Sequence, residues 1–197
     1  CMTDSVSFPA VFWGAIKIGA IPVPVNTMLT DVDYVYMLHD SCARVLVVSE
    51  SLYPKFAPHI DGQSSLQEVV IDGSSIDGRR SLSVLMESFE AELPTAPTKR
   101  ENSAFWLYTS GSTGQPKGVV HRHSDLAQTA RLYGDGILKL DQSDVVFSAA
   151  KLFFAYGLGN SMSFPLHVGC RTVLLADRPT PEIVLSVMKE QKVSIFF

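Results

Sequence analysis

The sequence has few of the features by which proteins bind nucleic acids or enter membranes. Its 197 residues include 16 Lys or Arg and 20 Asp or Glu, for a formal net charge of −4, and the basic residues form no run that could follow a phosphodiester backbone. The most apolar stretch, residues 11–25, is interrupted by Lys17, Pro22 and Pro24 and falls short of the roughly 20 apolar residues of a membrane-spanning helix. We therefore expect neither a nucleic-acid partner nor a membrane span.

Cysteine is scarce as well. The three cysteines, Cys1, Cys42 and Cys170, are odd in number, widely spaced and set in apolar surroundings. This pattern argues against the disulfide framework of a small secreted domain and is typical of reduced thiols in a cytosolic protein. We expect the thiols to be buried and inert, and the protein to be cytoplasmic.

The chain also lacks an initiator Met and a signal peptide. It begins with Cys-Met-Thr and ends in a strand-like run, residues 193–197, with no turn after it. We interpret the chain as an internal fragment of a longer protein.

The sequence does contain a regular alternation of helix and strand patterns. Short apolar runs that alternate with helical spacing predict an α/β fold with mostly parallel sheets flanked by helices. The expected helices are 8–18, 31–39 with Thr30 as its cap, 52–60, one that starts at 124–125, and 181–190. The expected strands are 44–48, 66–71, 105–108, 119–121, 145–147, 172–175 and 193–197, with a short extended segment at 21–25. Residues 93–102 contain two prolines and several polar side chains, so we place a boundary between two lobes there.

One stretch is too rich in glycine for a helix and too polar for a core: Thr109-Ser-Gly-Ser-Thr-Gly-Gln-Pro-Lys-Gly118. Gly111, Gly114 and Gly118 allow positive φ and close approach of the backbone, so successive N–H groups can surround phosphate oxygens. Lys117 adds a mobile point charge. Rotatable hydroxyl groups come from Thr109, Ser110, Ser112 and Thr113. The stretch predicts a polyphosphate-binding loop.

Two well-known phosphate loops do not match this stretch. A Walker A loop requires G-x-x-x-x-G-K-[ST] before a helix, whereas Gly114 is followed by Gln-Pro-Lys-Gly and then by a predicted strand. The glycine-rich loop of kinases fails because the glycines here are spaced three and four apart. On spacing alone, a mobile surface loop without a ligand remains the alternative.

The same stretch resembles the phosphate-binding signature of the AMP-forming acyl-CoA synthetases, the adenylate-forming family that includes luciferases and the adenylation domains of peptide synthetases. The resemblance extends over nearly the whole chain. "VFWGAIKIGAIPVPVN" (11–26) is similar to an early helix and strand of these enzymes, and "KLFFAYGLGNSMSFPLHVGC" (151–170) resembles the segment that lines their acyl pocket. In detail the chain looks most like the members that activate benzoate and 4-hydroxybenzoate. Residues 1–197 would then be an incomplete N-terminal ATP- and acyl-binding domain.

The resemblance implies a two-step reaction. An aromatic carboxylate attacks the α-phosphate of MgATP to give an acyl-adenylate and pyrophosphate, and the thiolate of coenzyme A then displaces AMP. By the same resemblance Lys117 is catalytic, because it and the amides of 111–118 would offset charge on the leaving pyrophosphate. The implied cofactor-binding residues are Thr109, Ser110, Gly111, Ser112, Thr113, Gly114, Lys117 and Gly118.

The resemblance also implies an acyl pocket at Ala155 and Tyr156. The run 153–156 is followed by Gly157 and Gly159, and this mixture of flat rings and absent side chains can leave a slot for a planar acyl group. On residue type alone, such a run is more often core.

Other conspicuous residues are left out of the predicted site. His121 and His123 alternate on a strand without a third ligand nearby in sequence, so no metal site is predicted in this chain. We expect Lys151 and Arg171 to be solvated. Tyr108, at the end of a strand, is interpreted as a core aromatic residue.

Several parts that the resemblance requires are not found in the sequence. They are a Tyr-x-x-Thr-Glu segment for adenine and Mg²⁺, an Asp for the ribose hydroxyls, and a C-terminal domain with its own Lys. We therefore expect the 197 residues alone to be inactive, and nothing in the sequence indicates an oligomeric state. Two alternatives stay open: another adenylate-forming enzyme, for a fatty acid or an amino acid, or a nucleotide-binding module without turnover.

Overall fold

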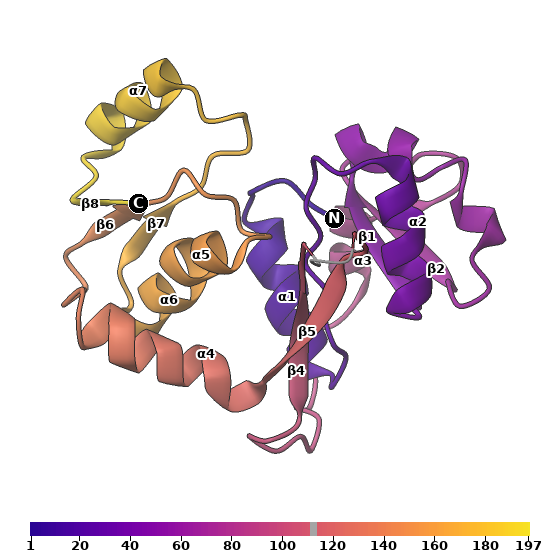
Figure 1. Cartoon of the computed structure of the whole chain (residues 1–197), viewed down its shortest axis with the longest axis horizontal. Helices are drawn as coiled ribbons and strands as arrows, with labels where there is room; N and C mark the ends of the chain where they lie inside the picture. The colour runs from indigo at the N-terminus through magenta and orange to yellow at the C-terminus, as the bar shows by residue number, and fades with distance from the viewer. Residues whose placement is uncertain (111–113) are drawn as a thin grey trace.

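The computed structural model describes residues 1–110 and 114–197 (Figure 1). Its α-helices are α1 (Ser7–Lys17), α2 (Asp31–Asp40), α3 (Leu82–Ser88), α4 (His123–Thr129), α5 (Ala155–Leu158), α6 (Phe164–Val168) and α7 (Pro181–Gln191). Two 3₁₀ segments are η1 (Glu50–Lys55) and η2 (Ile60–Gly62), and two π-helical segments are η3 (Ala130–Asp135) and η4 (Gly159–Ser163). The strands are β1 (Val45–Ser49), β2 (Glu68–Asp72), β3 (Arg80–Ser81), β4 (Ser103–Thr109), β5 (Lys117–Arg122), β6 (Val145–Phe147), β7 (Arg171–Val173) and β8 (Ile195–Phe196).

Among the described residues the strands form three small sheets. Two are parallel, with the orders β1-β2-β3 and β7-β6-β8, and the third is the antiparallel hairpin β4-β5. In Figure 1 the hairpin and α1 lie between the first parallel sheet with α2 and α3, and the second with α4 to α7. The predicted α/β class with mostly parallel sheets is confirmed, and the hairpin is its antiparallel exception.

The predicted elements agree with the observed ones where a local physical signal is strong. At the start of α2, the Thr30 N–H donates to Oδ2 of Asp33 at 3.1 Å, and the Asp33 N–H donates to Oγ1 of Thr30 at 3.4 Å, which makes the expected cap. The helix predicted at 52–60 is wrong. Pro54 and Pro58 supply no N–H, and the segment forms a 3₁₀ helix followed by a turn instead.

Two helical regions were not predicted: α3, and the run from α5 through η4 to α6. The extended segment 21–25 belongs to no sheet, although the carbonyl oxygen of Pro22 accepts the Trp106 N–H at 3.1 Å. Sequence 155–168 contains two Gly, two Ser, an Asn and a Pro, which are modest or poor helix formers, so packing rather than propensity sets its conformation.

One core cluster connects α1, β4 and α5. Phe12 of α1 packs edge-on against Phe105 of β4, with ring centroids 5.5 Å apart. Leu158 of α5 is buried in the same cluster. Its buried members are Met2, Phe8, Phe12, Ala104, Phe105, Leu107, Leu152, Leu158 and Met162. Strand β4, which leads into the glycine-rich stretch, and helix α5, which carries Ala155 and Tyr156, therefore pack on the same core cluster.

Residues 93–102 contain no helix or strand. The Ala96 N–H donates to the carbonyl oxygen of Lys17 at 2.8 Å, so the segment lies against the end of α1. Gly19 has φ +79°, and a Cβ there would lie 3.0 Å from the Cβ of Ala96. The boundary between lobes at 93–102 stays a prediction.

Two further expectations concern the surface. No helix in the described parts of the chain is long and apolar enough to cross a bilayer. All three cysteines are free thiols, but they are not all buried as expected, because Cys42 is exposed and Cys1 and Cys170 are half-buried.

Candidate functional site

The predicted phosphate-binding stretch lies at the turn of the β4–β5 hairpin. Thr109, the last residue of β4, pairs with Lys117, the first of β5. Both side chains are exposed, as are Ser110, Gly114 and Gly118. Gly111, Ser112 and Thr113 lie outside the described residues. Five of the eight predicted cofactor-binding residues therefore lie together at one accessible end of the hairpin, where a polyphosphate can reach them.

The two described glycines of the stretch have different physical roles. Gly114 has φ +96°, a conformation that strains other residues and that was expected of the glycines in this stretch. Gly118 is not among the positive-φ residues. A Cβ on Gly118 would lie 3.2 Å from Cε3 of Trp106 and 3.6 Å from Cζ of Tyr108. Gly118 thus makes room for two rings of the neighbouring strand.

Helix α2 holds both flanks of the stretch. The hydroxyl of Tyr36 donates to the carbonyl oxygen of Pro116 at 3.1 Å, and the hydroxyl of Tyr108 donates to Oδ2 of Asp40 at 2.6 Å. Tyr36 and Asp40 are four residues apart, so they project from the same face of α2. Tyr108, just before the glycine-rich stretch, and Pro116, near its end, therefore both form hydrogen bonds with the same face of α2.

This arrangement corrects the interpretation of Tyr108 as a core residue. Tyr108 is half-buried, and its hydroxyl reaches an exposed carboxylate. Burial and the bond to Asp40 raise the pKa of Tyr108, so the phenol stays protonated and donates. Sequence reasoning missed both Tyr36 and Asp40. Their spacing on α2 was visible, but nothing in the sequence showed which strand they would meet.

Lys117 is exposed at the start of β5. Within the described residues, the structure contains no hydrogen bond or ion pair for its ammonium group. No other group in that part of the chain competes with an anionic ligand for this cation. This position suits the electrostatic role that the resemblance implies.

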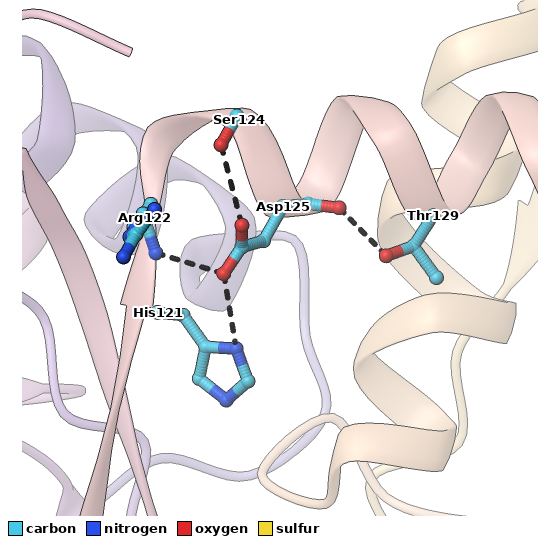
Figure 2. Close-up of polar contacts among 5 residues, drawn as sticks. All are labelled: His121, Arg122, Ser124, Asp125 and Thr129. Atoms are coloured by element: carbon cyan, nitrogen blue, oxygen red, sulfur yellow. Dashed lines mark hydrogen bonds and ion pairs between the residues drawn. The ribbon is translucent and has the colours of Figure 1, made fainter. Parts of the chain in front are cut away.

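His121 belongs to the opposite end of the hairpin, where β5 passes into α4 (Figure 2). Its ring stacks on Phe105 with centroids 4.5 Å apart and an interplanar angle of 5°. Its Nδ1 lies 3.7 Å from Oδ2 of Asp125, and the same oxygen accepts the Arg122 N–H at 2.9 Å. His121 therefore packs and braces the strand-to-helix junction.

Asp125 is the centre of the contacts in Figure 2. Ser124 donates its hydroxyl to Oδ1 of Asp125 at 3.3 Å, and Thr129 donates its hydroxyl to the backbone carbonyl of Asp125 at 2.6 Å. In residues 1–110 and 114–197 no group of three or more His, Cys, Asp and Glu side chains is placed to hold a metal ion.

The predicted acyl-binding residues lie on the first turn of α5. Ala155 and Tyr156 are both exposed, Tyr156 to 56%. The ring of Tyr156 meets Phe197 edge-on at 6.3 Å between centroids. Phe153 is buried, whereas Phe154 is exposed. An exposed flat ring beside a small side chain is compatible with contact to a planar acid.

The slot expected from the two glycines of this segment is wrong. A Cβ on Gly157 would overlap the carbonyl oxygens of Ala150 and Lys151, and one on Gly159 would lie 2.8 Å from Cζ of Phe164. Both positions are filled by neighbours. The two glycines therefore allow neighbouring atoms to pack closely against α5 and leave no empty space at their own positions.

Lys151 was expected to be solvated, but its ammonium group is bonded within the protein. It is half-buried, and its ammonium group donates to the carbonyl oxygens of Leu175, Ala176 and Asp177, at 3.3 Å for Ala176 and 2.7 Å for Asp177. Burial lowers the pKa of Lys151, and the carboxylates of Asp4 and Asp177 act in the opposite direction. Arg171 is exposed, as expected, and donates to the carbonyl oxygen of Gln191 at 2.8 Å.

A cavity of about 570 Å³ lies away from these residues, beside β2 and α3. Glu50 and Asp72 contribute its carboxylates, and most of its other lining residues are serines or apolar side chains of α3. None of the predicted site residues lines it.

The chain is similar to known ligases along its whole length. The chain is 50% identical over 197 residues to the benzoate–CoA ligase of Thauera aromatica, covering all of this chain and 37% of the relative. It is 38% identical over 196 residues to a 4-hydroxybenzoate–CoA/benzoate–CoA ligase of Rhodopseudomonas palustris, of which it covers 36%. The chain thus spans just over a third of the length of these relatives.

Solved structures match equally well. A benzoate CoA ligase from Burkholderia xenovorans LB400 superposes with a TM-score of 0.90 at 39% identity, over 99% of this chain and 38% of that one. The anthranilate CoA ligase AuaEII, solved with anthranoyl-AMP, gives a TM-score of 0.95 at 35% identity, with the same coverage. The model of the family described as AMP-binding enzyme matches residues 1–197. The resemblance inferred from the sequence is confirmed: the chain belongs to the AMP-binding enzyme family and has the fold of part of the N-terminal domain of adenylate-forming enzymes.

Proposed function

We propose that the protein containing these residues is an aryl-CoA ligase, which uses ATP to convert a benzoate-like acid to its acyl-adenylate and then to the CoA thioester, releasing pyrophosphate and AMP. The observation that carries this proposal is the 50% identity to a benzoate–CoA ligase along all 197 residues. That span includes both the hairpin turn and the segment that carries Ala155 and Tyr156. The comparison therefore supports the nucleotide-binding and acid-binding parts together.

The hairpin turn would bind the phosphates of ATP. Exposed hydroxyls at Thr109 and Ser110, the positive φ of Gly114 and the exposed ammonium of Lys117 fit a polyanion. Mg²⁺ would neutralise phosphate charge, with its ligands outside this chain. Lys117 would stabilise the negative charge that grows on pyrophosphate as the acid attacks, an electrostatic contribution that is larger in the transition state than in the bound ATP. The other proposed nucleotide-binding residues are Gly118 of β5 and Gly111, Ser112 and Thr113, which lie outside the described residues.

Helix α5 would supply one wall of the acid site. Tyr156 offers the face or edge of its ring to a planar acid, and Ala155 leaves room beside it. ATP and coenzyme A are both cytosolic co-substrates, and the three free thiols agree with that compartment, so we place the protein in the cytoplasm.

The test is acid-dependent release of pyrophosphate by the purified full-length protein with benzoate, 4-hydroxybenzoate, anthranilate, hexanoate and palmitate. We expect the highest kcat/KM with an aromatic acid, and formation of the matching thioester when coenzyme A is added. Lys117→Ala serves as the matched control, since its loss of activity shows that the signal comes from this site. Absence of acid-dependent pyrophosphate release with every acid would contradict an adenylate-forming activity.

A second candidate is a fatty-acyl-CoA ligase. The chain is 34% identical over 136 residues to a long-chain-fatty-acid–CoA ligase of Mycobacterium tuberculosis. That match covers 69% of the chain, less than the aromatic-acid ligases cover. A higher kcat/KM for palmitate or hexanoate than for every aromatic acid would favour this candidate.

A further inference from the structure

Asp4 is a buried carboxylate near the start of the chain. Its side chain lies ahead of α1 and is 5% exposed. Oδ1 and Oδ2 both accept the N–H of Leu152, at 3.1 and 3.3 Å, across 148 residues of sequence. Burial raises the pKa of Asp4 to about 6, while the Leu152 N–H and the charge of Lys151 act against this rise. An apolar residue would avoid the cost of burying an acid here, so this contact calls for an explanation.

The partner of Asp4 belongs to the turn that leads into α5. Within residues 148–154, here called the α5 lead, the N–H of Phe154 donates to the carbonyl oxygen of Lys151 at 3.0 Å. The N–H of Leu158, in turn, donates to the carbonyl oxygen of Phe154 at 2.8 Å. Gly157 is packed so closely on the α5 lead that any side chain there would overlap it. A displacement of the α5 lead must therefore displace α5, together with Ala155 and Tyr156.

The α5 lead is held on two sides by distant parts of the chain. On one side Lys151 donates to three consecutive carbonyl oxygens after β7. On the other side Asp4 accepts from Leu152, whose side chain is fully buried in the core shared with α1 and β4. Asp4 thereby connects the helix that carries the acid-binding residues to the same body that carries the hairpin turn.

We infer that Asp4 is a positioning residue for the acid-binding wall: its carboxylate holds the α5 lead so that Ala155 and Tyr156 of α5 meet the ring of the acid at a fixed distance from the hairpin turn. The inference rests on the proposed function. The contact touches neither substrate, so its loss moves the acid site while the turn that binds ATP keeps its anchors on α2.

Kinetics of the full-length protein test this separation. Asp4→Leu replaces the carboxylate by a larger apolar side chain and removes the acceptor, whereas Asp4→Asn keeps the size and one acceptor oxygen. Because a buried N–H without a partner is costly, we expect Asp4→Leu to raise the KM for the aromatic acid about tenfold, with the KM for ATP within about twofold of the parent. Asp4→Asn should stay within about twofold for both. Glu87→Ala, which removes an exposed carboxylate of α3, is the control and should leave both constants unchanged.

Several results would overturn the inference. One is a parental acid KM in Asp4→Leu, another is an equal rise in the KM values for acid and ATP, and a third is an Asp4→Asn variant as impaired as Asp4→Leu. If the acid panel shows a fatty acid to be the substrate, the proposed function fails, and the same comparison is made with that acid.

Hydrogen exchange tests the contact without any turnover. In the unaltered full-length protein the Leu152 amide should exchange slowly, and a peptide covering 148–156 should exchange at least about tenfold faster in Asp4→Leu than in Asp4→Asn. Should Asp4→Leu fail to fold, the unaltered protein still decides, because fast exchange at Leu152 means that Asp4 does not hold the α5 lead.

Discussion

Removing the hydroxyl of Tyr108 tests whether α2 positions the phosphate-binding turn. Tyr108→Phe deletes one oxygen and leaves the ring that packs beside Gly118. The lost bond, to Oδ2 of Asp40 at 2.6 Å, joins a neutral donor to a carboxylate. Such bonds contribute about 1.5–3 kcal/mol when buried. Here Asp40 is exposed and Tyr108 only half-buried, so solvent screening reduces the value to about 1 kcal/mol, or about fivefold in kcat/KM for ATP.

The assay is a double-mutant cycle on pyrophosphate release by the full-length protein, with ATP varied at saturating acid. Tyr108→Phe and Asp40→Ala should each lower kcat/KM for ATP about fivefold, and the double variant should be little worse than either single variant. Tyr36→Phe, which cuts the other tie to α2, gives an independent fall of the same direction. Fully additive effects of Tyr108→Phe and Asp40→Ala, or a fall confined to the KM for the acid, would refute the reasoning.

Four further predictions concern the candidate site and Asp4. Lys117→Ala in the full-length protein should lower the rate of pyrophosphate release by about 10–100-fold, because one charge-assisted contact is lost. Binding of the aromatic acid, measured by calorimetry, should change little. Equal rates of pyrophosphate release in mutant and parent would reject this role. Ala155→Phe should exclude benzoate, because the larger ring would overlap the acid. Tyr156→Ala should raise the KM for benzoate and relax discrimination against hexanoate, since ring contacts contribute about 0.5–1.5 kcal/mol. If both variants keep the parental kcat/KM for both acids, neither residue contacts the acid. The 197-residue chain alone should form no benzoyl-CoA above a no-protein control, because the groups for ribose, metal and adenylation that the resemblance requires are not in it; product formation would contradict this. Burial raises the pKa of Asp4 from its usual value of 3.8 to about 6, so between these values the folded protein holds a proton that the unfolded chain has lost, and the free energy of unfolding falls as the pH rises. Asp4→Asn should therefore have a higher free energy of unfolding than the parent at pH 8, by up to about 3 kcal/mol, and this difference should shrink towards pH 4. A difference that does not change with pH would contradict the raised pKa of Asp4.

The fold was predictable wherever a local signal dictates the structure. Thr30 ahead of an acidic first turn predicted α2, and the Val-rich run before Ser49 predicted β1, because capping and short buried strands depend on neighbouring residues. The hairpin was only half predictable. Both strands were expected, but their antiparallel pairing depends on the turn between them, and a glycine-rich turn of that length has no fixed sequence signature.

The candidate site was predictable to the extent that it is local. Residues 109–118 are contiguous in the sequence, so their chemistry could be inferred residue by residue. Tyr36, Asp40 and Asp4 act through partners 68 to 148 residues away, and no spacing rule connects them. Gly157 and Gly159 were misinterpreted for a related reason. A missing side chain leaves a slot only if no neighbour fills it, and here the carbonyls of the α5 lead and the ring of Phe164 do.

The two halves of the candidate site share a core but are held by different polar contacts. Phe105 of β4 and Leu158 of α5 belong to one cluster, whereas α2 braces the hairpin turn and Asp4 braces the α5 lead. Substitutions in the shared core should therefore disturb ATP and acid kinetics together, and substitutions that remove one of these polar contacts should disturb only one of them. A rigid core transmits small displacements to both the hairpin and α5. The change in the KM for ATP relative to the change in the KM for the acid therefore identifies which contact a variant has lost, even where overall activity falls by the same factor.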